Sequence, residues 1–142
     1  AVASRDVTMI AGAVVIGGRG YDNVVTVLNG GRTTLPYRAR MPVPVSMWQP
    51  WRAWFGASGG ARASLFADPV IEIAGRRIAP LICYEQLLVW PVLQSALNHP
   101  DTVVAIANGW WASGTSIPAI QRASVEAWSR LFTLDLVSSS NS

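Results

Sequence analysis

Cys83 is the single cysteine of the sequence, and a carboxylate, Glu85, follows it two residues later. The apolar run 78–82 before the cysteine predicts a short buried strand, and the apolar stretch 87–97 behind it is compatible with a helix. A thiol at such a strand-to-helix turn can lie near backbone N–H groups and the positive end of the helix dipole. That setting favours the thiolate and offers hydrogen-bond donors to a developing oxyanion. If this turn is present, we expect the Cys83 thiol to have a lowered pKa and to be alkylated moderately faster than a free cysteine.

The alternative interpretation of Cys83 is structural, because most free cysteines are small buried hydrophobes. A single cysteine also excludes an internal disulfide and leaves the cellular compartment undetermined. The sequence pattern around the thiol keeps both interpretations open.

The composition predicts one packed domain. Of the 142 residues, 51% are hydrophobic and 13% are charged, which is typical of a globular piece with much buried strand. All eleven basic residues are arginines, and their scatter argues against binding of nucleic acid. No cluster of His, Cys and carboxylates has metal-ligand spacing, so we expect neither a metal nor a cofactor. Glu85 interrupts the longest apolar run, which is then shorter than the roughly 18 residues of a membrane-spanning helix.

The order of the expected elements indicates a mixed α/β fold. The expected strands lie at residues 7–16, 21–28, 33–37, 70–73, 78–82, 102–107 and from about 134 onward. The first two strands pair as a hairpin, and so do the fourth and fifth, whereas residues 38–62 form a long aromatic-rich loop. The strands 78–82 and 102–107 are expected side by side, with the helix between them on one face of the sheet.

Two helices are expected to begin near prolines. Proline is tolerated at the first helical position, which favours helix starts near Pro91 and Pro118. In the second helix, spacing places four residues on one apolar face, namely Ile120, Ala123, Ala127 and Leu131. Strand-like sequence at both ends indicates a fragment of a larger domain.

Several motifs, taken in order, resemble the nitrilase superfamily of carbon–nitrogen hydrolases, in the branch that includes apolipoprotein N-acyltransferases. The segment 75–85, Gly-Arg-Arg-Ile-Ala-Pro-Leu-Ile-Cys-Tyr-Glu, is similar to the nucleophile string of that branch. The Asn-Gly-Trp-Trp loop at 108–111 is similar to its loop after the next strand. Together with the segment 86–91, this loop is most similar to the conjugal-transfer TraB proteins of plasmids.

The resemblance implies an αββα sandwich, present over residues 1–142 as a single partial domain that lacks an N-terminal strand–helix unit and C-terminal strands. It also implies a Glu–Lys–Cys triad in which Cys83 attacks an acyl carbon and forms a thioester. Glu85 would lie at the site without being the general base. The implied substrate is an acyl or amide compound, and Tyr84, Asn108, Trp110 and Trp111 are the residues expected to bind it.

Two departures from the family pattern affect the chemistry that the resemblance implies. The base glutamate belongs on a strand before the first hairpin and would precede Ala1. By register Ala39 occupies the position of the lysine, and Arg38 and Arg40 flank it as alternative cations for the oxyanion. We therefore expect the isolated chain to be inactive as a carbon–nitrogen hydrolase.

Alternative functions follow from the same departures. One is a non-catalytic nitrilase-fold interaction module in conjugation that has lost the catalytic lysine, and another is a similarity of fold alone, with Cys83 in the core. The sequence leaves the partners open. They include other conjugation proteins and a second copy of the chain in a homodimer. The sequence also leaves open whether the parent protein is attached to a membrane.

Overall fold

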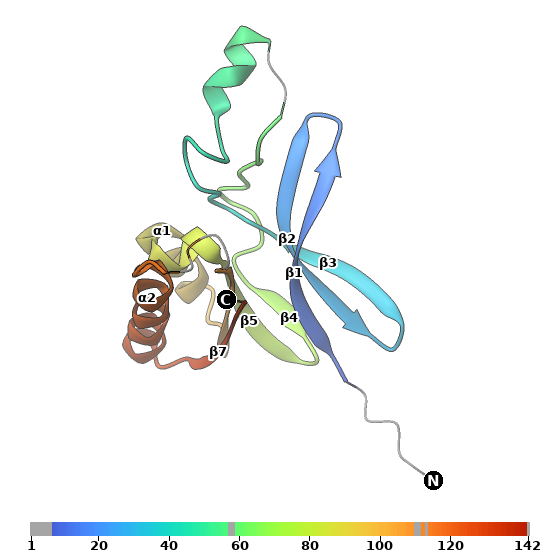
Figure 1. Cartoon of the computed structure of the whole chain (residues 1–142). Helices are drawn as coiled ribbons and strands as arrows, with labels where there is room; N and C mark the ends of the chain where they lie inside the picture. The colour runs from blue at the N-terminus through green and yellow to red at the C-terminus, as the bar shows by residue number, and fades with distance from the viewer. Residues whose placement is uncertain (1–6, 57–58, 110–111, 113, 142) are drawn as a thin grey trace.

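The computed structural model describes residues 7–56, 59–109, 112 and 114–141, which form two β-sheets and helices (Figure 1). The antiparallel three-stranded sheet has the order β1 (Met9–Gly17), β2 (Gly20–Asn29) and β3 (Arg32–Arg38). The four-stranded sheet has the order β4 (Ile71–Ile73), β5 (Arg76–Ile82), β6 (Thr102–Asn108) and β7 (Asp135–Asn141). β4 pairs with β5 in an antiparallel hairpin, whereas β5, β6 and β7 run parallel. The predicted hairpins and the adjacency of β5 and β6 are confirmed.

A shared apolar core holds the two sheets face to face. Val25 and Tyr37 of the first sheet pack with Ile78 and Val104 of the second. Successive side chains of a strand point to opposite faces, so alternate residues of β6 reach this core and the others reach the helices. The close approach of the sheets is visible at Gly12, where an added Cβ would lie 3.2 Å from the Ile106 side chain.

The helices α1 (Val89–Ala96) and α2 (Ile117–Phe132) cover the outer face of the four-stranded sheet. Leu81 and Val103 of the sheet pack there against Val92 of α1 and Val125 of α2. The layers are thus helix, sheet and sheet. Met9 and Val15 lie on the face of β1 opposite the core residue Ile10, and they leave apolar surface exposed on the outer side of the first sheet. Among the described residues, no helix is long and apolar enough to cross a membrane.

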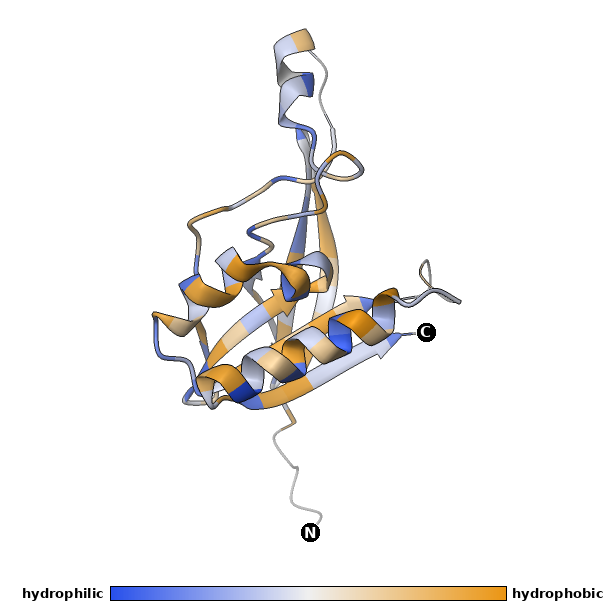
Figure 2. Cartoon of the chain, turned by 90° about the vertical axis from the view of Figure 1, so that its left-hand side faces the viewer, coloured by the Kyte–Doolittle hydropathy of each residue, from blue (hydrophilic) through white to orange (hydrophobic). Residues whose placement is uncertain are grey.

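The structure corrects two expectations about the helices. The chain behind β5 first forms a five-residue 3-10 helix, η2 (Cys83–Leu87), and α1 begins at Val89, two residues before Pro91. The predicted apolar face of α2 is also wrong, because its members Ile120 and Leu131 are exposed. Figure 2 shows the mixed hydropathy of this helix, which leaves its inward side undetermined by pattern alone. The side that packs on the sheet carries Val125, Trp128 and Phe132.

Candidate active site

Cys83 begins a sharp turn at the carboxyl end of β5. The strand ends at Ile82, which pairs with Ile106 of the parallel strand β6. The backbone of Cys83 has a φ of 46°, which lies in the left-handed region that residues other than glycine rarely adopt. The backbone N–H of Asn108, at the end of β6, donates to the Cys83 Sγ at 3.3 Å. The thiol therefore lies at the edge of the sheet where parallel strands end, a common place for ligand sites in α/β folds.

The thiol is not activated in the way that the sequence predicted. Burial raises the pKa of Cys83 above its ordinary value, the hydrogen bond from the Asn108 N–H opposes this change, and the Glu85 carboxylate adds to it. The segment that follows is a short 3-10 helix instead of an α-helix, so the expected helix dipole does not begin at Cys83. The prediction of a lowered pKa is wrong for this chain, because burial outweighs the single backbone donor.

Glu85 is completely buried and ties three segments together. Its carboxylate accepts hydrogen bonds from the Arg40 N–H at 2.6 Å, the Met41 N–H at 3.2 Å and the Ile82 N–H at 2.9 Å. The Tyr37 hydroxyl donates to the same carboxylate at 2.9 Å. Burial raises the pKa of Glu85, although the N–H of Ile82 and the charge of Arg40 oppose that shift. Glu85 therefore fixes the residue before Cys83 against the segment that follows β3.

Arg40 is completely buried, and its guanidinium makes structural contacts. Nε donates to the Tyr37 hydroxyl at 3.0 Å and lies 4.0 Å from a Glu85 oxygen. The two terminal nitrogens donate to α1, at 2.9 Å to the Pro91 carbonyl and at 2.9 Å to the Ser95 hydroxyl. None of these described partners is Cys83. The guanidinium therefore links the segment after β3 to α1 by hydrogen bonds and places a positive charge near the Glu85 carboxylate.

Arg38 and Ala39 occupy the other two positions of interest after β3. The Arg38 side chain is 61% exposed and lies 3.5 Å from the Asp22 carboxylate, which Arg62 also contacts through a bidentate pair. Ala39 is buried, and its N–H donates to the Asn23 carbonyl at 2.7 Å. The described contacts thus bring neither arginine onto the thiol.

The residues expected to bind substrate are only partly described. Asn108 is exposed and lies beside Cys83, and Tyr84 is half-buried in η2. Trp110 and Trp111 lie outside the described residues. The expected pocket between their loop and residues 38–44 therefore stays a prediction.

Two residues of this region were missed as site residues by the sequence interpretation. The sequence interpretation gave Tyr37 no role at the site, yet its hydroxyl accepts a hydrogen bond from the Arg40 Nε and donates one to the Glu85 carboxylate. Asn141, at the end of β7, accepts the Gly109 N–H at 3.0 Å with its side-chain oxygen. The sequence did hold a signal for Asn141. It lies at the end of a strand expected beside β6, and the loop after Asn108 passes this end of the sheet.

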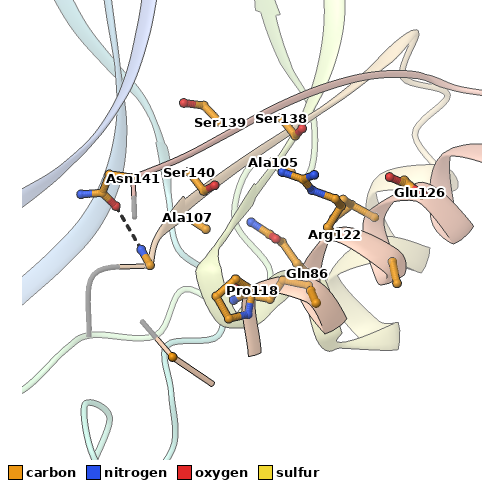
Figure 3. A pocket seen from close by; sticks show the side chains of 16 residues that line it. Gln86, Ala105, Ala107, Pro118, Arg122, Glu126, Ser138, Ser139, Ser140 and Asn141 are labelled. Atoms are coloured by element: carbon orange, nitrogen blue, oxygen red, sulfur yellow. Dashed lines mark hydrogen bonds between the residues drawn. The ribbon is translucent and has the colours of Figure 1, made fainter. Parts of the chain in front are cut away.

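A cavity of about 800 Å³ lies between α2 and the ends of β6 and β7 (Figure 3). Its lining includes Gln86, Arg122 and Glu126 together with the serines of β7, and the figure shows the polar side chains around the opening. Its lining residues Ala105 and Val125 belong to the core between the sheet and the helices, so this cavity lies on the helical side of the sheet. Cys83 is not among its described lining residues. No group of three or more His, Cys, Asp or Glu within the described ranges is arranged to hold a metal ion.

Comparison with known proteins shows the family of the chain. A family model described as Carbon-nitrogen hydrolase matches residues 1–130, so the chain belongs to the carbon–nitrogen hydrolase family. It is 58% identical over 136 residues to the conjugal transfer protein TraB of Agrobacterium fabrum, covering 96% of the chain and 32% of that relative. It is 54% identical over 141 residues to the probable conjugal transfer protein TraB of Sinorhizobium fredii, covering 99% and 36%. The chain spans about a third of the length of these curated relatives.

Solved structures show the same fold. A cysteine-to-alanine mutant of the amidase from Nesterenkonia AN1, of the nitrilase superfamily, matches with a TM-score of 0.64 at 16% identity, over 96% of this chain and 47% of that one. The complex of this mutant amidase with butyramide matches with a TM-score of 0.65 at 15% identity, over 96% and 48%. At such low identity the likeness shows the fold alone. The chain is a partial αββα sandwich of the nitrilase type, as the sequence predicted.

Proposed function

We propose that the intact parent protein uses Cys83 as a nucleophile on an acyl carbon, and that this chain supplies the nucleophile's part of the site. The observation that carries the proposal is the turn at the end of β5, where the backbone of Cys83 lies in the left-handed region although Cys83 is not a glycine. Such backbone strain costs on the order of 1–3 kcal/mol and is concentrated at functional sites. The Asn108 N–H at the sulfur gives the same turn one donor for developing negative charge.

The proposed reaction has two steps. The Cys83 sulfur bonds to the carbonyl carbon of an amide or ester, the tetrahedral oxyanion collapses, and the C–N or C–O bond breaks to leave a thioester. The thiol proton passes through a base to the departing amine or alcohol. Water then hydrolyses the thioester, or an acceptor amine takes the acyl group. The first outcome is a hydrolase and the second an N-acyltransferase.

Because Ala39 stands in the lysine register and the described contacts of Arg38 and Arg40 lead elsewhere, the proposed site takes its base and its cation from outside the described residues. We retain Glu85 and Arg40 as positioning residues of the proposed site. Arg38, tied to Asp22, has no role in this version of the site.

A second candidate is a non-catalytic nitrilase-fold module that takes part in conjugation through protein contacts. It is favoured by a specific observation, namely that burial raises the pKa of Cys83, which favours the protonated thiol over the thiolate. Under this candidate, Glu85 and Arg40 serve only the stability of the fold.

Covalent trapping in the parent separates the candidates. One amidase with this fold is described as carrying a Michael adduct of acrylamide at its active-site cysteine. We expect the parent to form a mass-detectable acyl adduct with p-nitrophenyl acetate or an adduct with acrylamide, and Cys83→Ala to abolish both. Adduct formation and turnover that persist in Cys83→Ala would contradict the nucleophile. The isolated chain should turn over no simple amide, nitrile or acyl ester.

A further inference from the structure

Gln86 of η2 joins the ends of β5 and β6 by hydrogen bonds. The residue is 3% exposed and lines the cavity beside α2 (Figure 3). Its amide nitrogen Nε2 donates to the Ile106 carbonyl at 3.2 Å and to the Leu81 carbonyl at 3.4 Å. The Trp128 indole of α2 donates in turn to the Gln86 backbone carbonyl at 3.1 Å. Thus α2 holds the glutamine while its amide bridges both strands.

The orientation of the Gln86 amide follows from its partners. Both partners of Nε2 are carbonyl oxygens, which accept hydrogen bonds and cannot donate them. A reversed amide would place Oε1 against these two acceptors and would lose both hydrogen bonds. The nitrogen therefore faces the strands, and a side chain without an N–H donor cannot replace it.

The bridge lies where β6 loses its partner strand β5. Pairing of β5 with β6 ends at the pair of Ile82 with Ile106, whereas pairing of β6 with β7 continues to Asn108. Backbone groups beyond the last ladder pair need other hydrogen-bond partners. The Ile106 carbonyl obtains one from Gln86, and the Asn108 N–H obtains one from the Cys83 sulfur at 3.3 Å. Two side chains from η2 thus complete the same strand end.

The end of β6 is held from two sides. Ala107 alone separates Ile106 from Asn108, so the direction of the Asn108 N–H depends on how the Ile106 carbonyl is held. On the β7 side, the Gly109 N–H donates to the side-chain oxygen of Asn141 at 3.0 Å. An added Cβ at Gly109 would lie 2.7 Å from the Asn141 carbonyl oxygen, which leaves little room for movement there. On the β5 side, the glutamine amide holds the strand.

We propose that Gln86 is a positioning residue of the Cys83 site, which holds the Asn108 N–H at the sulfur through the Ile106 carbonyl. The inference rests on the proposed function, because this N–H serves chemistry only where Cys83 is a nucleophile. The hydrogen bond from Asn108 opposes the rise that burial causes in the pKa of Cys83. Among the described residues, Glu85 is the charged group that also raises this pKa, and no substitution used below alters it.

Alkylation of Cys83 across pH in the isolated chain tests the positioning role without any turnover. Gln86→Met keeps the length of the side chain and removes its N–H donor. We expect a further rise in the pKa of Cys83 and about threefold slower alkylation by iodoacetamide at pH 7, because a displaced Asn108 N–H stabilises the thiolate less. A merely structural role has the opposite sign. A loosened fold exposes the thiol, returns its pKa toward the ordinary value and speeds alkylation.

Gln121→Met is the matched control. Gln121 is 7% exposed and lines the same cavity from α2, and in the described part of the chain its side chain makes no hydrogen bond to β5 or β6. This substitution should leave the pKa of Cys83 unchanged. Trp128→Phe is a second variant that leaves Gln86 in place and removes the indole donor to its carbonyl. It should raise the pKa of Cys83 by a smaller amount, and circular dichroism shows whether each variant is folded.

The parent protein separates this inference from the proposed function. Gln86→Met should slow formation of the Cys83 acyl adduct with p-nitrophenyl acetate about tenfold, because a donor to the developing negative charge is displaced, and Gln121→Met should not. Absence of a Cys83-dependent adduct in the unaltered parent would contradict the proposed function. The positioning role is overturned by the isolated chain alone, if folded Gln86→Met or Trp128→Phe leaves the pKa of Cys83 unchanged or lowers it.

Discussion

The Arg40 N–H donates to the buried Glu85 carboxylate at 2.6 Å, while the Arg40 guanidinium reaches across to α1. Both ends of one residue therefore hold the segment after β3 against the segment that carries Cys83. The Ile82 N–H donates to the other oxygen of the same carboxylate, so the position of the thiol depends on a group that is three residues away from Ile82. This relationship makes Glu85 and Arg40 positioning residues in the proposed site.

Replacement of Glu85 by glutamine should destabilise the chain by about 2 kcal/mol or more. The carboxylate serves three backbone N–H groups and one hydroxyl, whereas a glutamine amide has only one acceptor oxygen and presents a donor to the remaining groups. A buried donor without a partner costs about 1–3 kcal/mol. Urea unfolding of the isolated chain measures the change. Glu126→Gln is the control, because Glu126 is half-exposed and its Arg130 contact is 4.0 Å long. Equal effects of the two substitutions would contradict the role of Glu85.

The same substitution should cost much more stability at Arg40 than at Arg38. Arg40→Met leaves the buried Glu85 without its cation and removes the donors to α1, which should cost about 3–5 kcal/mol. Arg38→Met removes an exposed partner of Asp22 and should cost less than about 1 kcal/mol. Thermal and urea unfolding give both values. Arg38→Met should also leave alkylation of Cys83 unchanged, and a slower reaction would return Arg38 to the site.

Alkylation of Cys83 in the isolated chain should be slow at neutral pH. Burial raises the pKa of the thiol, so the reactive thiolate is scarcer at pH 7 than in a free cysteine and increases only at higher pH. Because the pKa is higher in the folded state, the stability linked to the protonated thiol is present below the ordinary thiol pKa. It is lost as the pH rises through the raised value.

Iodoacetamide kinetics across pH, followed by mass spectrometry, measure this effect on Cys83. The same chain in urea is the control, and it should react faster at pH 7 because unfolding exposes the thiol and restores its ordinary pKa. A folded chain that reacts faster than the unfolded one would show an activated thiolate.

The strands were predictable because their patterns are local. The Gly-Gly-Arg-Gly turn at 17–20 separates two apolar runs and predicts the β1–β2 hairpin, which the structure confirms. The apolar run 78–82 placed Cys83 at the end of a buried strand, and β5 ends at Ile82. Such features depend on neighbours in sequence, which the sequence displays directly.

The roles of the arginines were not predictable from spacing. An arginine beside the lysine register suggests a cation for an oxyanion, but the fold buries Arg40 and leaves Arg38 at the surface. Which of the two points inward depends on Glu85, 45 residues further along the chain. The pKa of the thiol was equally inaccessible, because it depends on burial that only the packed structure defines.

The same limit explains the face of α2, and it gives a last prediction. Ile120 and Val125 are both aliphatic, yet Ile120 is 51% exposed and Val125 is 1% exposed against β6. Val125→Ala should destabilise the chain by about 1–2 kcal/mol, because removal of buried methyl groups leaves a cavity that the rigid sheet fills poorly. Ile120→Ala removes more atoms but should change stability by less than about 0.5 kcal/mol, since its side chain is already half in solvent. Urea unfolding of the two variants under the same conditions compares them directly. A larger effect at Ile120 would show that α2 packs with the face that the sequence pattern predicted.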